Sequence, residues 1–544
     1  MKMKKMKKRI GRIQVLAVML GGLGLCPGSA QAAAKVRVAE ALEWLYPDSR
    51  VEDVRVCEET DVPANGVAEA NVLFNGLKPG VPLQLLADCP DAEWFRLLDV
   101  PVPVNTGVDG EIETPGVTNV FVTRDAPFRV YDAMEPVEGG AFVPSASTAA
   151  VRFRLRKFNV VSGTQSVRFS FSQDGQTATR SFRINVHPVR IPPVGRKSFK
   201  YTNWMYYKQM ADSHGLAEWS PQHMEMIAKY VRLGVYGRQN TAMLPPFWEE
   251  KRLADFIRML DREGIAYFEG RHLATFSTGR WGAPAFNLYG STNLTTSAKG
   301  AAEVAEKASF IYGVLDKYGW KDRWYQHVAD EPSHHNANEY CKTCGIIRKY
   351  MPGIKLMDAL EAKTIVGVLD GYCPKNQYYE ENRDFFESLR TRPSDEIWCY
   401  TCMTPGGKWM NRVLDQELIR PLLIPWGCRR FGLDGYLHWG YNWFTPKTDP
   451  LKGGMTLAQY RVEKVPPGDC NLIYAGKDGP LPSVRLEAMR QGFEDCDLLQ
   501  VLSDRDKPTA DCLVVRLVRG FADYTTDVGE YRKVRRALLK ALAR

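Results

Sequence analysis

The chain has 544 residues, which is too long for one ordinary domain, and its 44% hydrophobic and 11% aromatic content excludes a disordered chain. Of its 72 basic and 63 acidic residues, seven basic ones lie between Met1 and Arg12. Without that segment the balance is 65 to 63, which gives no support for a nucleic-acid or polyanion partner.

Residues 1–32 are predicted to be an export signal. A basic start precedes a short apolar run over residues 15–25, and Ala30-Gln31-Ala32 supplies the small-residue cleavage pattern. Cys26 raises lipidation as an alternative, although Leu25 stands where a small residue is expected. No later run is long and apolar enough to span a bilayer. We therefore expect a periplasmic or extracellular protein without a membrane span.

Twelve cysteines become eleven after cleavage, an odd number for an exported protein. Cys57 and Cys89 lie in one region and could pair. Two C-x-x-C pairs, 341–344 and 399–402, are compatible with a thiolate zinc site, with local disulfides or with free thiols. The first pair falls in a helical pattern and the second in an apolar strand, which favours the last two interpretations.

Residues 33–196 are predicted to form an N-terminal β-sandwich. Short runs of alternating polarity recur at 149–156, 165–172 and 178–186, and turn signals such as Asp174-Gly175 separate them. The proline-rich stretch 188–193 is typical of a stiff linker.

From residue 197 to 480 the pattern changes to strand, loop and helix. Alternating strands and helices predict a parallel sheet, and eight such units over this length fit a (β/α)8 TIM barrel. An open doubly wound sheet is the alternative, but the glycine-rich phosphate loop typical of it is absent from the sequence. The eight candidate strands are 200–207, 234–241, 265–271, 324–330, 354–359, 366–371, 396–403 and 434–443.

Residues 481–544 are predicted to be a helical segment packed on the barrel, because Leu486, Met489, Phe493 and Leu498 recur at helical spacing. The fold class is thus α/β, with a sandwich, a barrel and a helical C-terminal segment.

Polar and aromatic side chains cluster where the candidate barrel strands end. In such barrels the carboxyl ends of the strands carry the chemistry, and rings combined with amide and charged groups suit a sugar. Each residue taken alone also fits a role in the core or the rim. The predicted substrate-binding set is Asn203, Arg271, His272, Trp398, Tyr400, Trp439, Tyr441, Asn442 and Trp443.

The sequence Asp330-Glu331-Pro332 ends the fourth candidate strand, and three interpretations of its adjacent carboxylates compete. They could stabilise the first turn of the following helix. They could bind a metal with His327, His334 and His335, although that spacing matches no closed zinc set. They could hydrolyse a glycoside, where the two usual carboxyls lie roughly 5 to 9 Å apart on different strands. Adjacent carboxylates fit the substrate-assisted variant, in which one orients the sugar's acetamido oxygen and the other moves the proton.

Five segments together resemble glycoside hydrolase family 123, over about residues 200–505: Asp330-Glu331-Pro332, 352–358, 398–402, 435–443 and 485–495. The resemblance implies an N-terminal β-sandwich and an exo-acting β-N-acetylgalactosaminidase that retains configuration through an oxazolinium intermediate. By position, Asp330 is expected to stabilise the acetamido group and Glu331 to be the general acid/base.

The expected partner is a glycan or glycolipid, with no metal or organic cofactor needed and no oligomeric state predicted. The alternatives are an exo-glycosidase of other sugar specificity on the same barrel, or a non-catalytic glycan-binding protein.

Overall fold

The computed structural model describes residues 34–453 and 465–544. Residues from Ala34 onward form one compact unit, so the boundaries near residues 196 and 480 stay predictions. The predicted export signal, with Cys26, lies outside the described residues. Within them, every helix is too short or too polar to cross a bilayer.

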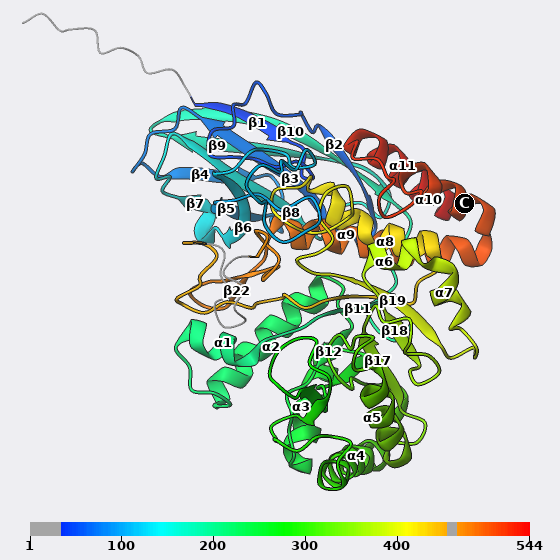
Figure 1. The fold of residues 1–544 in the computed structure, drawn as a ribbon. Coiled ribbons are helices and arrows are strands. Elements are labelled where there is room, and N and C mark those ends of the chain that lie inside the picture. The colour runs from blue at the N-terminus through cyan, green and yellow to red at the C-terminus, as the bar shows by residue number, and fades with distance from the viewer. Residues whose placement is uncertain (1–33, 454–464) are drawn as a thin grey trace, which may run out of the picture. The chain divides into compact units, whose positions relative to one another are not determined.

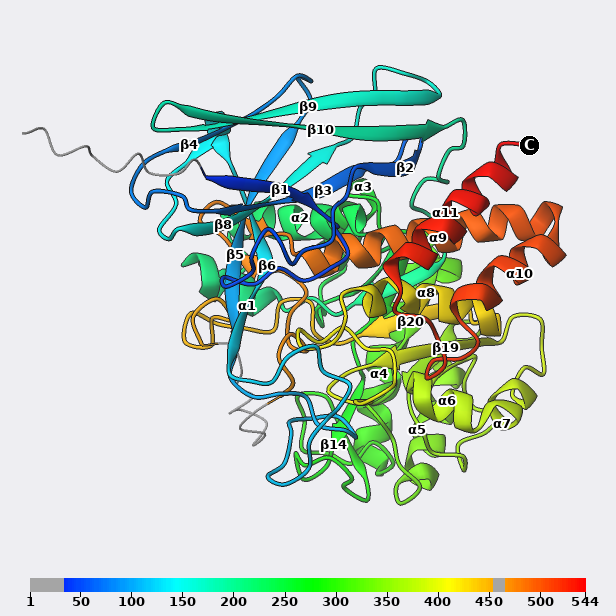
Figure 2. The ribbon, with the colours of Figure 1, turned by 90° about the horizontal axis from the view of Figure 1, so that it is seen from above.

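The N-terminal part is a β-sandwich of two five-stranded sheets, which Figure 2 shows as stacked layers. All pairs are antiparallel except β2 with β10, which is parallel. One sheet has the order β1 (Lys35–Ala39), β3 (Ala68–Asn75), β8 (Thr148–Leu155), β5 (Glu93–Val102) and β6 (Phe128–Pro136). The other has the order β2 (Glu59–Pro63), β10 (Gln176–His187), β9 (Gly163–Gln173), β4 (Leu83–Ala87) and β7 (Ala141–Phe142).

The sandwich core forms because alternate residues of these strands are apolar and face the opposite sheet. Phe153 of β8 and Phe169 of β9 are fully buried, with ring centroids 4.7 Å apart, and Trp94 of β5 packs on the same cluster. The three alternating runs seen in the sequence are β8, β9 and β10, so this part of the prediction is confirmed.

Eight parallel strands then form a nearly closed barrel, in which the first strand pairs with the last and the second to eighth strands pair in sequence order. Between the first and second strands, the amide of Asn240 donates to the carbonyl of Tyr201 at 3.2 Å. The predicted (β/α)8 barrel is confirmed. Its strands are β11 (Lys200–Asn203), β12 (Thr241–Met243), β13 (Tyr267–Gly270), β16 (Trp324–Gln326), β17 (Lys355–Ala359), β18 (Gly371–Cys373), β19 (Glu396–Thr401) and β20 (Gly435–His438).

Two of the eight strand positions were wrong. The expected strand 234–241 begins only at Thr241, because α2 (Pro221–Tyr236) continues through the apolar residues 233–236. The expected strand 366–371 is a loop, and β18 starts at its last residue. Short apolar runs fit both a buried strand and the end of a helix, so their period alone does not decide between them.

Helices and small hairpins surround the barrel (Figure 1). The hairpins are β14 (Ala274–Phe276) with β15 (Phe286–Leu288), and β21 (Tyr474–Ala475) with β22 (Pro480–Leu481). The remaining helices are α1 (Tyr207–His214), α3 (Glu250–Arg262), α4 (Ala298–Tyr318), α5 (Ala337–Tyr350), α6 (Asn376–Glu381), α7 (Arg383–Ser388), α8 (Ile419–Phe431), α9 (Val484–Arg505), α10 (Lys507–Leu517) and α11 (Val528–Leu542), with 3₁₀ turns at Glu138–Gly140 and Lys321–Arg323.

Helix α9 is the predicted C-terminal helix and joins the barrel to the sandwich (Figure 1). Its Arg485 is fully buried and pairs with Asp132 of β6 at 2.9 Å, while Arg490 pairs with Glu69 of β3 at 2.6 Å. Buried charges are tolerated only when they are paired in this way, so these contacts fix the orientation of the sandwich against the helix.

Candidate active site

The two adjacent carboxylates follow β16 at the carboxyl end of the barrel, where Asp330 and Glu331 have different partners. Glu331 has φ of +43°, a left-handed backbone conformation that is uncommon for a residue with a side chain. Strain of this kind persists where the surrounding structure enforces it, and it clusters at functional sites. Here it accompanies two neighbouring carboxylates that have different partners.

Two aromatic donors hold the carboxylate of Glu331. The hydroxyl of Tyr400, at the end of β19, donates to Oε1, and the indole N–H of Trp281 donates to Oε2 at 3.1 Å. Burial, together with the charge of Glu331, raises the pKa of Tyr400 well above its usual value, so its hydroxyl stays protonated and able to donate. The carboxylate is therefore held in one orientation while it remains partly open to solvent.

Asp330 lies closer to negative charge than to positive charge and, unlike Glu331, has no strong hydrogen-bond donor in contact among the described residues. Its Oδ1 is 4.0 Å from Nε2 of His272. Desolvation in the barrel rim and the charges of Glu331 and Asp358 raise the pKa of Asp330 to about 7, against the opposing charge of Arg271. Since 56% of the side chain is exposed, water offsets part of the burial effect and the neighbouring carboxylates sustain the rise. The raised pKa thus falls on Asp330, which the mechanism expected from the sequence needs as a carboxylate.

A buried charged network lies beneath this pair. The two ring nitrogens of His327 each contact a carboxylate at 3.0 Å, Nδ1 that of Asp358 and Nε2 that of Glu269. Asp358 also accepts hydrogen bonds from the amides of Val328 and Ala329, at 3.0 and 2.9 Å. Asp358 therefore fixes the backbone immediately before Asp330. The two carboxylates outweigh burial and raise the pKa of His327 to about 9, so the ring is an imidazolium at neutral pH.

The stability of the protein is expected to depend on the charge of His327. Its pKa in the folded state lies above the unfolded value near 6.5, so the stabilisation is fully present below that pH and is lost as pH rises through about 9. A shift of this size corresponds to about 3 kcal/mol. Urea unfolding between pH 6 and 10 should show this loss in the wild type, and the loss over that range should be about 3 kcal/mol smaller in His327→Gln.

His334→Gln is the matched control, because His334 is an exposed histidine in the same loop whose Nδ1 contacts only Thr364 Oγ1 at 3.1 Å. An equal loss of stability in the wild type and the His327 variant, or a loss reduced as much in the His334 variant, would contradict the assignment.

Metal binding at this network is not favoured by its hydrogen bonding. Donor atoms of His272, His327 and Asp358 lie within 4.8 Å of one another, in a grouping that differs from the histidine set weighed in the sequence. However, both nitrogens of His327 donate to carboxylates, which leaves no lone pair for a cation. In the described part of the chain no group of thiolates meets the same distance limit. All eleven described cysteines are free, so Cys57 and Cys89, which the sequence allowed to pair, are not joined.

The structure brings three of the predicted binding residues close to the carboxylate pair. These are Tyr400, His272 and Arg271. The ring of Trp204 packs edge-on against His272, with ring centroids 5.3 Å apart. Trp439 and Trp443 pack against each other at 5.9 Å, and the indole of Trp439 donates to Asp469 at 3.2 Å. Their contact with substrate stays a prediction.

The other predicted binding residues lie in the protein interior with their polar atoms engaged. Trp398 is fully buried inside the barrel and donates to Glu396 at 2.9 Å. Asn203 accepts from Arg412 at 2.7 Å, and the hydroxyl of Tyr441 donates to the carbonyl of Tyr230 at 3.0 Å. Asn442 makes two hydrogen bonds with the backbone of Tyr206, at 3.0 and 3.1 Å. These contacts favour structural roles.

Three residues of the site were not singled out as site residues from the sequence: Asp358, Glu269 and Trp281. Asp358 ends the segment 352–358 that carries part of the family resemblance, and Glu269 lies one residue before the end of β13, so both had a signal in the sequence. Trp281 lies in the irregular tip between β14 and β15, where no periodicity or motif marks it.

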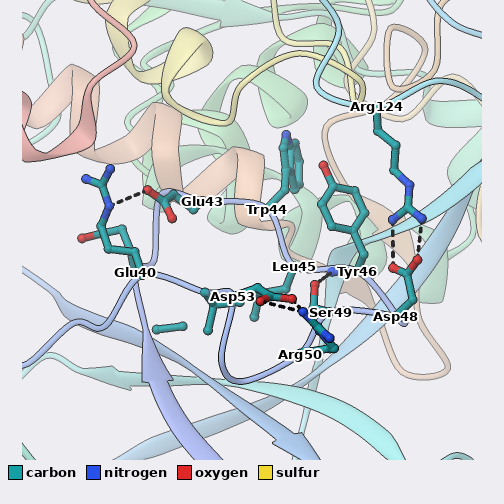
Figure 3. Close-up of a pocket in the computed structure, with 13 residues that line it drawn as sticks. Glu40, Glu43, Trp44, Leu45, Tyr46, Asp48, Ser49, Arg50, Asp53 and Arg124 are labelled. Carbon is teal, nitrogen blue, oxygen red and sulfur yellow. Dashed lines mark hydrogen bonds and ion pairs between the residues drawn. The ribbon is translucent and has the colours of Figure 1, made fainter.

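A cavity of about 340 Å³ elsewhere on the chain provides a contrast (Figure 3). It is lined by the loop after β1, residues 39–55, and by Arg124. Its carboxylates are paired: Asp53 contacts Arg50 at 2.6 Å, and Asp48 contacts Arg124. Hydrogen bonds from these arginines lower the pKa of each aspartate, opposite to the shift at Asp330. The contrast is confined to these two aspartates, because burial raises the pKa of Glu43 in the same lining although it contacts Arg55 at 2.9 Å.

Comparisons with known proteins show what this chain is similar to. Residues 307–502, which include both carboxylates, match the family model "Glycoside hydrolase 123, catalytic domain". A family 123 glycoside hydrolase from Clostridium perfringens, studied for glycolipid glycan hydrolysis, has the same fold. The match has a TM-score of 0.67 at 12% identity and covers 94% of this chain and 97% of that one.

Two further solved structures match too loosely to carry an argument. A β-glucuronidase from Parabacteroides merdae has a TM-score of 0.32 at 9% identity, covering 85% of this chain and 52% of that one. A family 5 mannosidase from Rhizomucor miehei has a TM-score of 0.34 at 12% identity, covering 61% and 96%. No curated protein matches the chain. Residues 307–502 thus resemble the catalytic domain of glycoside hydrolase family 123, which supports a glycosidase activity, and the chain shares the fold of one solved member of that family.

Proposed function

We propose that this glycoside hydrolase is an exo-acting, retaining enzyme that removes terminal β-linked N-acetylgalactosamine by substrate-assisted catalysis. The observation that carries the proposal is the divergence of Asp330 and Glu331. Glu331 is oriented by Tyr400 and Trp281, whereas Asp330 lies toward His272 on a network of buried charge. One carboxylate can therefore serve the leaving group while its neighbour serves the acetamido group.

In this mechanism Glu331 gives its proton to the glycosidic oxygen as the bond to the anomeric carbon breaks. The acetamido oxygen of the same sugar forms a bond to that carbon, and the ring that results carries positive charge. Asp330, as a carboxylate, accepts the acetamido N–H and stabilises that charge. Glu331 then takes a proton from water as water opens the intermediate, which restores the starting state.

The charge beneath the pair supports this role for Asp330. Glu269 and Asp358 carry two negative charges against one positive charge on His327, so the network has an excess of negative charge. A preorganised negative site of this kind stabilises a cation that develops only during reaction. It also favours a cationic intermediate over a covalent ester with Asp330.

The substrate class follows from the same reasoning. Substrate assistance requires a 2-acetamido group, and the family 123 enzyme from Clostridium perfringens was studied for glycolipid glycan hydrolysis. These points support β-N-acetylgalactosaminides of glycans or glycolipids as substrates of this chain. We further propose that the enzyme reaches them outside the cytoplasm, through the export signal expected at residues 1–32.

Hydrolysis of matched aryl glycosides tests the proposal. We expect turnover of the β-N-acetylgalactosaminide, with the β-N-acetylglucosaminide as the stereochemical comparison. The plain β-galactoside should react at least about 10³-fold more slowly, because it lacks the internal nucleophile and its effective concentration. Equal rates on the galactoside would refute substrate assistance. Binding of the sugars without turnover of any would favour a glycan-binding protein.

A further inference from the structure

Trp281 has an arrangement that folding alone does not require. It lies in the tip between β14 (Ala274–Phe276) and β15 (Phe286–Leu288), and 70% of its surface is exposed. Its indole N–H nevertheless donates to Oε2 of Glu331 at 3.1 Å. A large ring exposed to water contributes little to the stability of the fold, yet this one is hydrogen-bonded to the candidate acid.

The hairpin tip is anchored on both sides of this ring. Ala283, two residues later, is buried, and its carbonyl accepts a hydrogen bond from the side chain of Asn336 at 2.9 Å. Before the ring, the amide of Ser277 donates to the carbonyl of Ala285 at 3.0 Å and closes the tip. Gly279 and Gly282 flank the ring with φ of +66° and +78°, which side-chain-bearing residues rarely adopt. The tip therefore presents the ring in a defined position.

The position of the ring relative to Glu331 indicates which part of a substrate it faces. A general acid lies beside the glycosidic oxygen, so a group that contacts the acid from the solvent side faces the leaving group. The face of an indole carries partial negative charge, and it attracts the partly positive C–H groups on the flat side of a sugar ring. The indole N–H can donate a stronger hydrogen bond to Glu331 once Glu331 has lost its proton and become a carboxylate.

We propose that Trp281 is the platform for the sugar ring on the leaving-group side of the scissile bond. This inference rests on the proposed function, since it takes Glu331 as the acid. The ring selects substrates whose terminal residue is linked to a second pyranose over those with a small alkyl group. The N–H acts separately, by orienting Glu331 for every substrate alike.

Two variants separate these roles. Trp281→Phe keeps an aromatic face and removes the N–H, whereas Trp281→Ala removes both. The substrates are a disaccharide with β-N-acetylgalactosamine on galactose and methyl β-N-acetylgalactosaminide, which have comparable leaving groups and differ in the second ring. The ratio of kcat/KM for disaccharide to methyl glycoside cancels any effect of the N–H, because that effect is common to both substrates.

We expect this ratio to fall about tenfold in Trp281→Ala and to stay within about twofold of the wild type in Trp281→Phe. Trp248→Ala is the control, since Trp248 is also exposed (36%) but packs on Phe310 of α4. A ratio unchanged in Trp281→Ala, or lowered equally by Trp248→Ala, would overturn the inference.

Failure of the proposed function gives a different result, namely a wild type that cleaves neither substrate. Calorimetric titration with the intact disaccharide then decides the inference on its own. Weaker binding by Trp281→Ala than by Trp281→Phe supports the platform, and equal binding rejects it.

Discussion

Glu331→Gln is expected to slow the hydrolysis of glycosides with poor leaving groups by about 10²–10⁴-fold, and to slow an activated aryl glycoside far less. The amide keeps the size of the side chain but has no proton to give. A methoxide or sugar alkoxide leaves only if it is protonated, whereas a nitrophenolate leaves without help. The measurement is kcat/KM for a series of glycosides, plotted against the pKa of the leaving group. The slope should be shallow in the wild type and steep in the variant.

Glu339→Gln provides the control for this prediction. Glu339 is an acid on α5, in the same region of the chain, and it bonds Lys342 at 2.6 Å and the hydroxyl of Thr296. Its replacement should leave the slope unchanged. Identical slopes for wild type and Glu331→Gln would show that another group supplies the proton.

Much of the fold was predictable because its local patterns agree with its tertiary structure. The alternation that identified β8, β9 and β10 reflects one face buried against the other sheet. The eight strand–helix units required a parallel sheet. The strand 234–241 was misplaced because α2 ends in Val235 and Tyr236, which are residues that also suit strands. Only the packing of α2 on the barrel decides between them.

The site was predictable to the extent that its residues are neighbours in sequence. Asp330 and Glu331 lie in one motif, and the loop after β13 identified Arg271 and His272. The remaining error arises from the alternation of faces along a strand. In β11, Thr202 donates to Glu269 within the network below the site at 2.6 Å, while the next residue, Asn203, bonds Arg412 outside it. Position at a strand end therefore does not show which way a side chain points.

Residues that are distant in sequence and meet only in the folded protein could not be identified as site residues from the sequence. Trp281 is 50 positions from Glu331 in sequence and lies on an irregular hairpin tip. The network below the pair joins β13, the end of β16 and β17, and its charge depends on distances of 3.0 Å that spacing does not encode. These contacts orient the catalytic pair, and they follow only from the closed barrel.

Asp330→Asn is expected to slow activated and poor leaving groups alike, by about 10²–10³-fold, because it removes the charge that stabilises the acetamido group in the transition state. Comparison with Glu331→Gln is the test. Glu331→Gln should change the slope of the rate against leaving-group pKa, whereas Asp330→Asn should lower all rates equally and keep the slope. If Asp330→Asn kept near-wild-type rates on both classes of substrate, the catalytic site would lie elsewhere.

The pH profile gives a second measurement on the same variant. Desolvation and the charges of Glu331 and Asp358 raise the pKa of Asp330 to about 7, and the carboxylate is the active form. The wild-type rate should therefore fall as pH drops through about 7, and Asp330→Asn should lose this limb, because its amide does not titrate. Since the folded protein disfavours the charge at this position, the neutral amide should not lower stability at pH 8. If Asp330→Asn loses activity but keeps its stability, Asp330 serves catalysis and does not stabilise the fold.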